Sequence, residues 1–136
     1  MIPLNYLAVL VAAVTAFIVG GVWYSPLIFG KAYLGLRGLD PVVASQSSMS
    51  AGEVVAEFFR WLVISFVLAR FVVQSSVADL SDGFRFALWM WLAIYTALAG
   101  SVLHEGTPWR LFAIHAGDGL VKVVLIVTIL VLWRAN

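Results

Sequence analysis

The sequence predicts an all-α membrane protein with four transmembrane helices in a bundle and a short interfacial segment after the first helix. Hydrophobic residues make up 63% of the 136 residues, charged residues make up only 11%, and the mean hydropathy is +1.04. Typical soluble domains are about 45–50% apolar and about 25% charged. Four stretches also reach the length of about 20 mostly apolar residues that a helix needs to cross a bilayer.

The composition excludes several classes of protein. An ordinary soluble globule of this size leaves roughly a third of its surface wet, so it could not bury this much apolar surface. Eight basic and seven acidic residues leave a net charge of +1, which offers no charged face to a nucleic acid. The chain has no cysteine, which excludes disulfides, thiolate catalysis, zinc–thiolate sites and iron–sulfur clusters. An integral membrane protein remains.

The whole chain, residues 1–136, is predicted to form a single transmembrane domain, with spans at about 4–24, 51–74, 83–104 and 108–134. The first stretch carries no charge. It lacks a basic leading region and ends in bulky aromatic residues instead of a small-residue cleavage site. It is therefore interpreted as a retained helix and not as a signal peptide.

Polar residues mark the starts of the other three spans. Ser50 and Glu53 have the spacing of a capping box at the start of the second span. Ser81 or Asp82 is the predicted N-cap of the third. Thr107 suits the N-cap of the fourth, with Pro108 at the first helical position, where a missing N–H is harmless.

The residues that follow the first helix are predicted to anchor it at the membrane surface. Pro26 should stop the helix, because the residue before a proline avoids the α region. Trp23 and Tyr24 lie where an aromatic belt is expected, and Ser25 should cap the following turn with Pro26 at its first position. The stretch 27–34 is too short to span and should lie at the interface.

Four spans would place both termini on one side of the membrane. The loops around 25–50 and 104–107 would then lie on the opposite side. Basic residues are nearly balanced between the two sides, so the positive-inside rule favours neither orientation strongly.

Ionisable residues cluster inside two of the spans, where they are costly and usually have a partner or a purpose. His115, Asp118 and Lys122 share one face of the last span, and Asp118 can pair with Lys122 within it. Glu57 and Arg60 share a face of the second span. If the two spans are neighbours, these groups form one polar layer roughly 10–15 Å below the surface.

The matched depths predict two pairs in this layer, Arg60 with Asp118 and Glu57 with His115. Two interpretations remain open. The pairs could be structural devices that set the helix register, because a polar group in hydrocarbon needs a partner. They could equally line a functional polar cavity for ions, protons or a polar ligand. In that case a change in the protonation of His115 should make the activity or conformation of the protein depend on pH between about 5 and 8.

Neither a cofactor nor a metal is expected. His104 and His115 would lie at different depths, which disfavours a haem held by two histidines. A zinc-binding HExxH motif is missing from the sequence. No phosphate-binding loop, serine triad or nucleophile elbow is present either, so nothing in the sequence supports an enzyme.

Several short strings are more specific than the hydropathy pattern. They are Asn5-Tyr6-Leu7-Ala8-Val9, Gly21-Val22-Trp23-Tyr24-Ser25-Pro26, Phe29-Gly30-Lys31 and, in the last span, Ile114-His115-Ala116-Gly117. With them the chain resembles the bacterial membrane family called domain of unknown function 1761, over most of its length and with four helices in the same order. The resemblance implies a multi-pass protein of the bacterial plasma (inner) membrane. It implies no activity and no catalytic residue.

Two functional hypotheses follow. The first is a small transporter or an ion- or proton-conducting protein, which would act as a homo-oligomer because four helices alone enclose little space. The second is a non-catalytic accessory or structural subunit packed on a larger membrane complex. Two groups of ionisable residues at one depth exceed what helix register needs, and this favours the first hypothesis. The expected partners are the lipid bilayer and other membrane subunits, not nucleic acid.

Overall fold

The predicted all-α fold class is confirmed by the computed structural model, which describes residues 3–40 and 49–134. Within these residues every regular element is a helix. The elements are α1 (Tyr6–Trp23), α2 (Gly30–Leu36), α4 (Ala51–Gln74), α5 (Leu80–Leu98), α6 (Gly100–His104) and α7 (Trp109–Leu132).

Three stretches of the described chain are long and apolar enough to cross a membrane: Tyr6–Trp23, Leu80–His104 and Trp109–Leu132. The predicted count of four spans is therefore not confirmed. The second predicted span, α4, is long enough at 24 residues, but it contains Glu53, Glu57, Arg60 and Arg70. Every 18-residue stretch of α4 contains at least three of these charges, whereas each of the three candidate spans has such a stretch with two or fewer.

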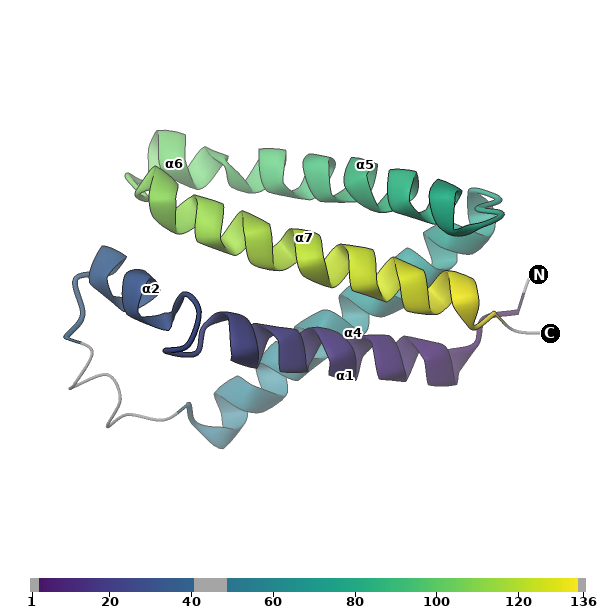
Figure 1. The fold of residues 1–136 in the computed structure, drawn as a ribbon, viewed down its shortest axis with the longest axis horizontal. Coiled ribbons are helices and arrows are strands. Elements are labelled where there is room, and N and C mark those ends of the chain that lie inside the picture. The colour runs from purple at the N-terminus through teal and green to yellow at the C-terminus, as the bar shows by residue number, and fades with distance from the viewer. Residues whose placement is uncertain (1–2, 41–48, 135–136) are drawn as a thin grey trace.

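The long helices form a layer with one helix crossing it, instead of a regular bundle. The helix α7 lies between α1 and α5 and packs against both, whereas α4 crosses obliquely and packs against α1 and α7 (Figure 1). The crossing turns one face of α4 toward the layer. Buried residues on that face recur at helical spacing: Trp61, Ser65, Leu68, Ala69 and Val72.

The predicted capping box of α4 is present. The Ser50 hydroxyl oxygen accepts from the Glu53 N–H, and the Glu53 carboxylate accepts from the Ser50 N–H. Two donors that no helical carbonyl can reach are thereby satisfied, which fixes the start of the helix.

Two other predicted caps are displaced. Asp79, instead of Ser81 or Asp82, caps α5, because its carboxylate reaches the Asp82 N–H at 2.9 Å. The helix consequently begins three residues earlier than predicted, at Leu80. Pro108, instead of Thr107, is the N-cap of α7, and the Thr107 N–H donates to the Ser101 carbonyl of α6 at 3.2 Å.

The described ends of α1 and α7 lie together (Figure 1). The Asn5 side-chain amide donates to the Trp133 carbonyl at 3.2 Å, while its oxygen accepts from the Ala8 N–H and caps α1. One side chain therefore both starts the first helix and ties it to the end of the last. The two helices run antiparallel along their length.

Small residues on α1 allow this close antiparallel packing. Ala8, Ala12 and Ala16 are fully buried and recur every four residues, so they form one stripe along the helix. The core on α7 that belongs to the same cluster consists of larger side chains, including Val123 and Ile126. Small residues facing large ones bring helix backbones near one another.

The glycine at position 119 of α7 is required by a side chain from α5. A Cβ there would overlap the hydroxyl and the ring of Tyr95. Gly21, on α1, differs, because a Cβ at that position would meet nothing within 4 Å. Packing therefore requires a glycine at position 119 but not at position 21, so the same substitution at the two positions can be compared.

We expect Gly119→Ala to destabilise the fold by about 1–3 kcal/mol, the usual cost of overpacking. Gly21→Ala should be neutral or stabilising by up to about 1 kcal/mol, since alanine is the better helix former. Thermal unfolding in detergent, followed by circular dichroism, measures both. Equal melting temperatures for the two variants would contradict the packing of Tyr95 against α7.

Candidate functional site

The most deeply buried charged groups of the described chain are Asp118 and Lys122, which form an ion pair within α7. The distance from Lys122 Nζ to Asp118 Oδ2 is 2.8 Å, and the two side chains are only 2% and 6% exposed respectively. The four-residue spacing puts them on adjacent turns of one helical face. Because each is taken out of water, each depends on the other for its charge to be tolerated.

Lys122 is enclosed by two neighbouring helices. Its ammonium nitrogen lies 4.3 Å from the centroid of the Trp61 ring on α4, a cation–π contact. On α1 it occupies the space next to Gly20, where a Cβ would approach within 2.8 Å of Nζ. A glycine and an indole thus make room for the charge and partly compensate it.

Trp61 also connects this pair to the two charged residues predicted on α4. Its Nε1–H donates to the Glu57 carboxylate at 3.0 Å, and the other oxygen of Glu57 accepts from Arg60. Glu57 is partly buried, whereas the Arg60 side chain is 63% exposed. The five predicted polar residues do not form one layer. Four of them are linked through Trp61, a residue that the sequence did not single out.

The two predicted pairs between the helices are wrong. Among the described residues Asp118 is paired with Lys122 and Arg60 is paired with Glu57, and His115 bonds to Tyr24 instead of Glu57. The prediction assumed parallel neighbouring helices, so that equal depth along each meant proximity. The oblique crossing of α4 removes that correspondence, and partners three or four residues away within the same helix are closer.

His115 forms a polar aromatic cluster with α1 and α2. The Tyr24 hydroxyl lies 2.5 Å from His115 Nδ1, and the Tyr33 ring packs edge-on against both rings. Burial, reinforced by the Asp118 carboxylate, raises the pKa of Tyr24, which follows the last residue of α1. The Tyr24 hydroxyl therefore keeps its proton at neutral pH and can donate it to the imidazole.

The aromatic residues of the predicted interfacial anchor lie against α7. Trp23 does end α1, as predicted, but its Nε1–H donates to the Ile114 carbonyl of α7 at 3.0 Å. Its ring occupies the space left by Gly117, where a Cβ would come within 2.8 Å of it. Both aromatic residues of the anchor therefore bind α7, and the apolar pattern alone could not distinguish this from a lipid-facing belt.

Ser25 begins the following turn with Pro26 at its first position, as predicted, because its carbonyl accepts from the Ile28 N–H at 3.1 Å. Its side chain does not cap that turn, because the hydroxyl donates to the Val22 carbonyl at 2.7 Å. Pro26 lies in the following turn, and the next helix begins only at Gly30. No side chain fits at position 30, because a Cβ there would lie 2.5 Å from the Tyr24 carbonyl oxygen.

A second tryptophan, Trp91 on α5, holds α7 from the other side. Its Nε1–H donates to the Ala116 carbonyl at 2.8 Å. Together with the bond from Trp23, this places an indole donor on each flank of α7, two residues apart along the chain. Both carbonyls precede Asp118 by one turn or less, so the indoles position the backbone that carries the ion pair.

One oxygen of the ion pair has no hydrogen-bond donor. Asp118 Oδ1 is buried and unpartnered in the described chain, as is Ser65 Oγ on α4. Most buried polar atoms in proteins have a partner, so an orphaned carboxylate oxygen indicates a place where a proton or a donor can be accepted. Among residues 3–40 and 49–134, no three His, Asp or Glu side chains gather closely enough to hold a metal ion.

The comparisons with known proteins concern the family alone. The model of the family described as protein of unknown function (DUF1761) matches residues 7–131. No curated protein and no solved structure matches the chain. The match covers α1 to α7, and so includes every residue of the site described above.

We expect Lys122→Met to destabilise the protein by about 3–5 kcal/mol, because Asp118 would be left as an uncompensated buried charge. The double variant Asp118→Asn with Lys122→Met should recover most of this loss. Arg60→Gln should cost less than about 1 kcal/mol, since the Arg60 side chain is mostly exposed.

Unfolding in mixed micelles of detergent and dodecyl sulfate, followed by circular dichroism, gives these free energies. If the double variant is as unstable as Lys122→Met alone, the two side chains do not act as a pair.

Proposed function

This chain belongs to the family described as protein of unknown function (DUF1761), and from its own residues we propose that it is a small multi-pass membrane protein that moves protons through the polar site around Asp118. It acts as a homo-oligomer in the bacterial plasma membrane. The proposal has three parts: insertion in a bilayer, a protonatable site inside it, and assembly of copies around that site.

Insertion is supported by the apolar surface as well as by helix length. The outer face of α5 exposes large apolar side chains, with Trp89 68% exposed and Phe84 53% exposed. Large contiguous apolar surfaces are rare on soluble monomers. Lipid is the solvent that such a surface suits, and α5 together with α6 makes a stretch long enough to span.

The unpartnered Asp118 Oδ1 is the observation that carries the proposal. A pair that served only to set helix register would be most stable with every buried polar atom bonded. Here one carboxylate oxygen accepts from Lys122, and the other is free to accept a proton. Ionisable groups in this position within a span commonly belong to ion pathways or proton relays.

Protonatable groups continue on either side of Asp118. His115 lies one turn before it and is hydrogen-bonded to Tyr24, where the chain leaves α1. Lys122 lies one turn after it. The three groups share a face of α7, and a proton can pass along such a series by exchange between side chains and intervening water, without a wide channel. This favours protons over larger ions.

Oligomerisation is proposed because one copy leaves part of the polar site uncovered. Asp118 and Lys122 are buried within one copy, but the Arg60 side chain is 63% exposed and the Glu57 side chain is 32% exposed. The three candidate spans form a layer that α4 crosses on one side (Figure 1). Copies packed against that side would cover these two residues.

An accessory subunit is the second candidate, and one observation favours it. Asp118 and Lys122 neutralise each other within a single helix, so the charges require no partner from elsewhere. In that case the exposed face of α5 would pack on another membrane protein. Purification distinguishes the two: a discrete homo-oligomer supports proton movement, and stable co-purifying subunits support the accessory role.

We expect purified protein in sealed liposomes to acidify or alkalinise the interior when a potassium gradient and valinomycin set a membrane potential. The internal pH is read with a trapped fluorescent dye. Asp118→Asn should abolish the flux, and His115→Gln should remove its dependence on pH between about 5 and 8. Glu105→Gln, which changes an exposed carboxylate in the loop before α7, is the matched control and should behave as the wild type.

Asp118→Asn alone leaves Lys122 unpaired and could fail to fold, so the double variant with Lys122→Met is measured beside it. That variant should fold and still conduct no protons. Wild-type flux in a folded double variant would overturn the proposal and leave the accessory role.

A further inference from the structure

The end of the molecule where α1 begins and α7 ends carries two adjoining hollows. They lie at the opposite end of α7 from His115 and Tyr24. One has a volume of about 390 Å³ and the other about 630 Å³, and both are lined by Leu4, Asn5, Trp133 and Arg134. Ligand-binding clefts commonly have volumes of about 300–1,000 Å³. The pair of hollows is therefore large enough to hold part of a small molecule.

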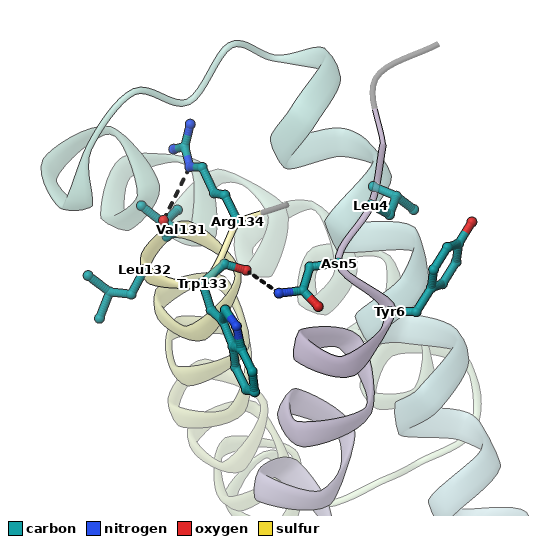
Figure 2. Close-up of a pocket in the computed structure, with 7 residues that line it drawn as sticks. All are labelled: Leu4, Asn5, Tyr6, Val131, Leu132, Trp133 and Arg134. Atoms are coloured by element: carbon teal, nitrogen blue, oxygen red, sulfur yellow. Dashed lines mark hydrogen bonds between the residues drawn. The ribbon is translucent and has the colours of Figure 1, made fainter. Parts of the chain in front are cut away.

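The two hollows differ in chemistry. The smaller one lies between α1, α4 and α7, and its walls are mainly apolar side chains such as Val72, Val73 and Leu130. The larger one is bounded by the ends of α1 and α7, where the Asn5 amide bridges to the Trp133 carbonyl (Figure 2). An apolar hollow thus continues directly into a polar one.

Arg134 is the one charged residue among the described residues that line either hollow. Its guanidinium is held in place: Nε donates to the Val131 carbonyl at 3.2 Å, and one terminal nitrogen donates to the Val77 carbonyl. The other terminal nitrogen makes no hydrogen bond within the described chain. A fixed guanidinium with a free donor, and no acidic residue in the lining, is complementary to an anion.

Ser76, two residues after the end of α4, is among the residues that line the smaller hollow. Its φ is 53°, the left-handed conformation that a helix end usually gives to glycine. A serine in this conformation is strained relative to glycine. The backbone conformation at this position favours glycine, yet the residue there has a side chain that can form hydrogen bonds.

We propose that these hollows bind one anionic phospholipid, with an acyl chain in the apolar hollow and the phosphate against Arg134 and Ser76. The proposal rests on the membrane insertion proposed above but not on proton movement. The hollows lie at the ends of two candidate spans, Tyr6–Trp23 and Trp109–Leu132, which is where the headgroups of a bilayer would lie. Basic pockets between transmembrane helices bind anionic headgroups in this way.

The test uses the full chain in detergent micelles, with phosphatidylglycerol or phosphatidylcholine of identical acyl chains added in equal amounts. Native mass spectrometry counts the retained lipid, and melting temperature reports stabilisation. The wild type should retain phosphatidylglycerol about fivefold more than phosphatidylcholine. Arg134→Gln should abolish this preference. Arg85→Gln removes an exposed charge outside both hollows, on the first turns of α5, and should preserve it.

Arg134 also ties α7 to the Val77 carbonyl, so a second variant guards against unfolding. Ser76→Gly relieves the positive φ, and it should reduce the preference for phosphatidylglycerol without lowering the melting temperature in detergent alone. The proposal is overturned if Arg134→Gln keeps the preference, or if Arg85→Gln loses it equally. It is also overturned if glycerol phosphate at the same concentration displaces the lipid, because the acyl chain would then contribute nothing. Failure of the proton-flux experiment would leave this result unaffected.

Discussion

The charge on Lys122 is the constraint on which the rest of the structure depends. An ammonium group that is almost completely buried is tolerated only where an opposite charge and other favourable contacts replace its water. Asp118, one turn earlier, supplies the charge, and the Trp61 ring lies beneath the nitrogen. Gly20 leaves the space that the side chain fills. Three helices, α1, α4 and α7, therefore meet at this one ammonium group.

The indole donors explain how α7 is held at that position. Trp23 from α1 and Trp91 from α5 donate to the Ile114 and Ala116 carbonyls, from opposite flanks of the helix. Each bond satisfies an indole N–H that would otherwise be buried without an acceptor. They also fix the rotation of α7 just before Asp118, so that His115 faces Tyr24 while Lys122 faces Trp61. Packing and polar chemistry are not separable here, because the same aromatic residues provide both.

Much of the fold followed from local patterns. The stretches 4–24 and 108–134 correspond to α1 and α7, since long apolar runs have few alternatives to a helix. The capping box at Ser50 and Glu53 was predicted because both partners lie within four residues. The end of α1 at Trp23 was predicted from Pro26 for the same reason. Predictions of this kind succeed where the interaction is contained in one turn of the chain.

The predicted pairs between α4 and α7 did not have that advantage. They depend on the angle at which the two helices cross, and α4 crosses obliquely (Figure 1). Arg60 therefore pairs with Glu57 in its own helix, and Asp118 pairs with Lys122 in α7. Likewise, Trp23 and Tyr24 have the composition of a lipid-facing belt, yet they contact α7, because Gly117 leaves room for an indole. The sequence by itself determined the helical class, the family, the helix ends set by local caps and the in-helix pair. Only the tertiary structure decided which aromatic residues face inward and which helices enclose the charged pair, because these contacts join residues tens of positions apart whose distances depend on how the helices cross.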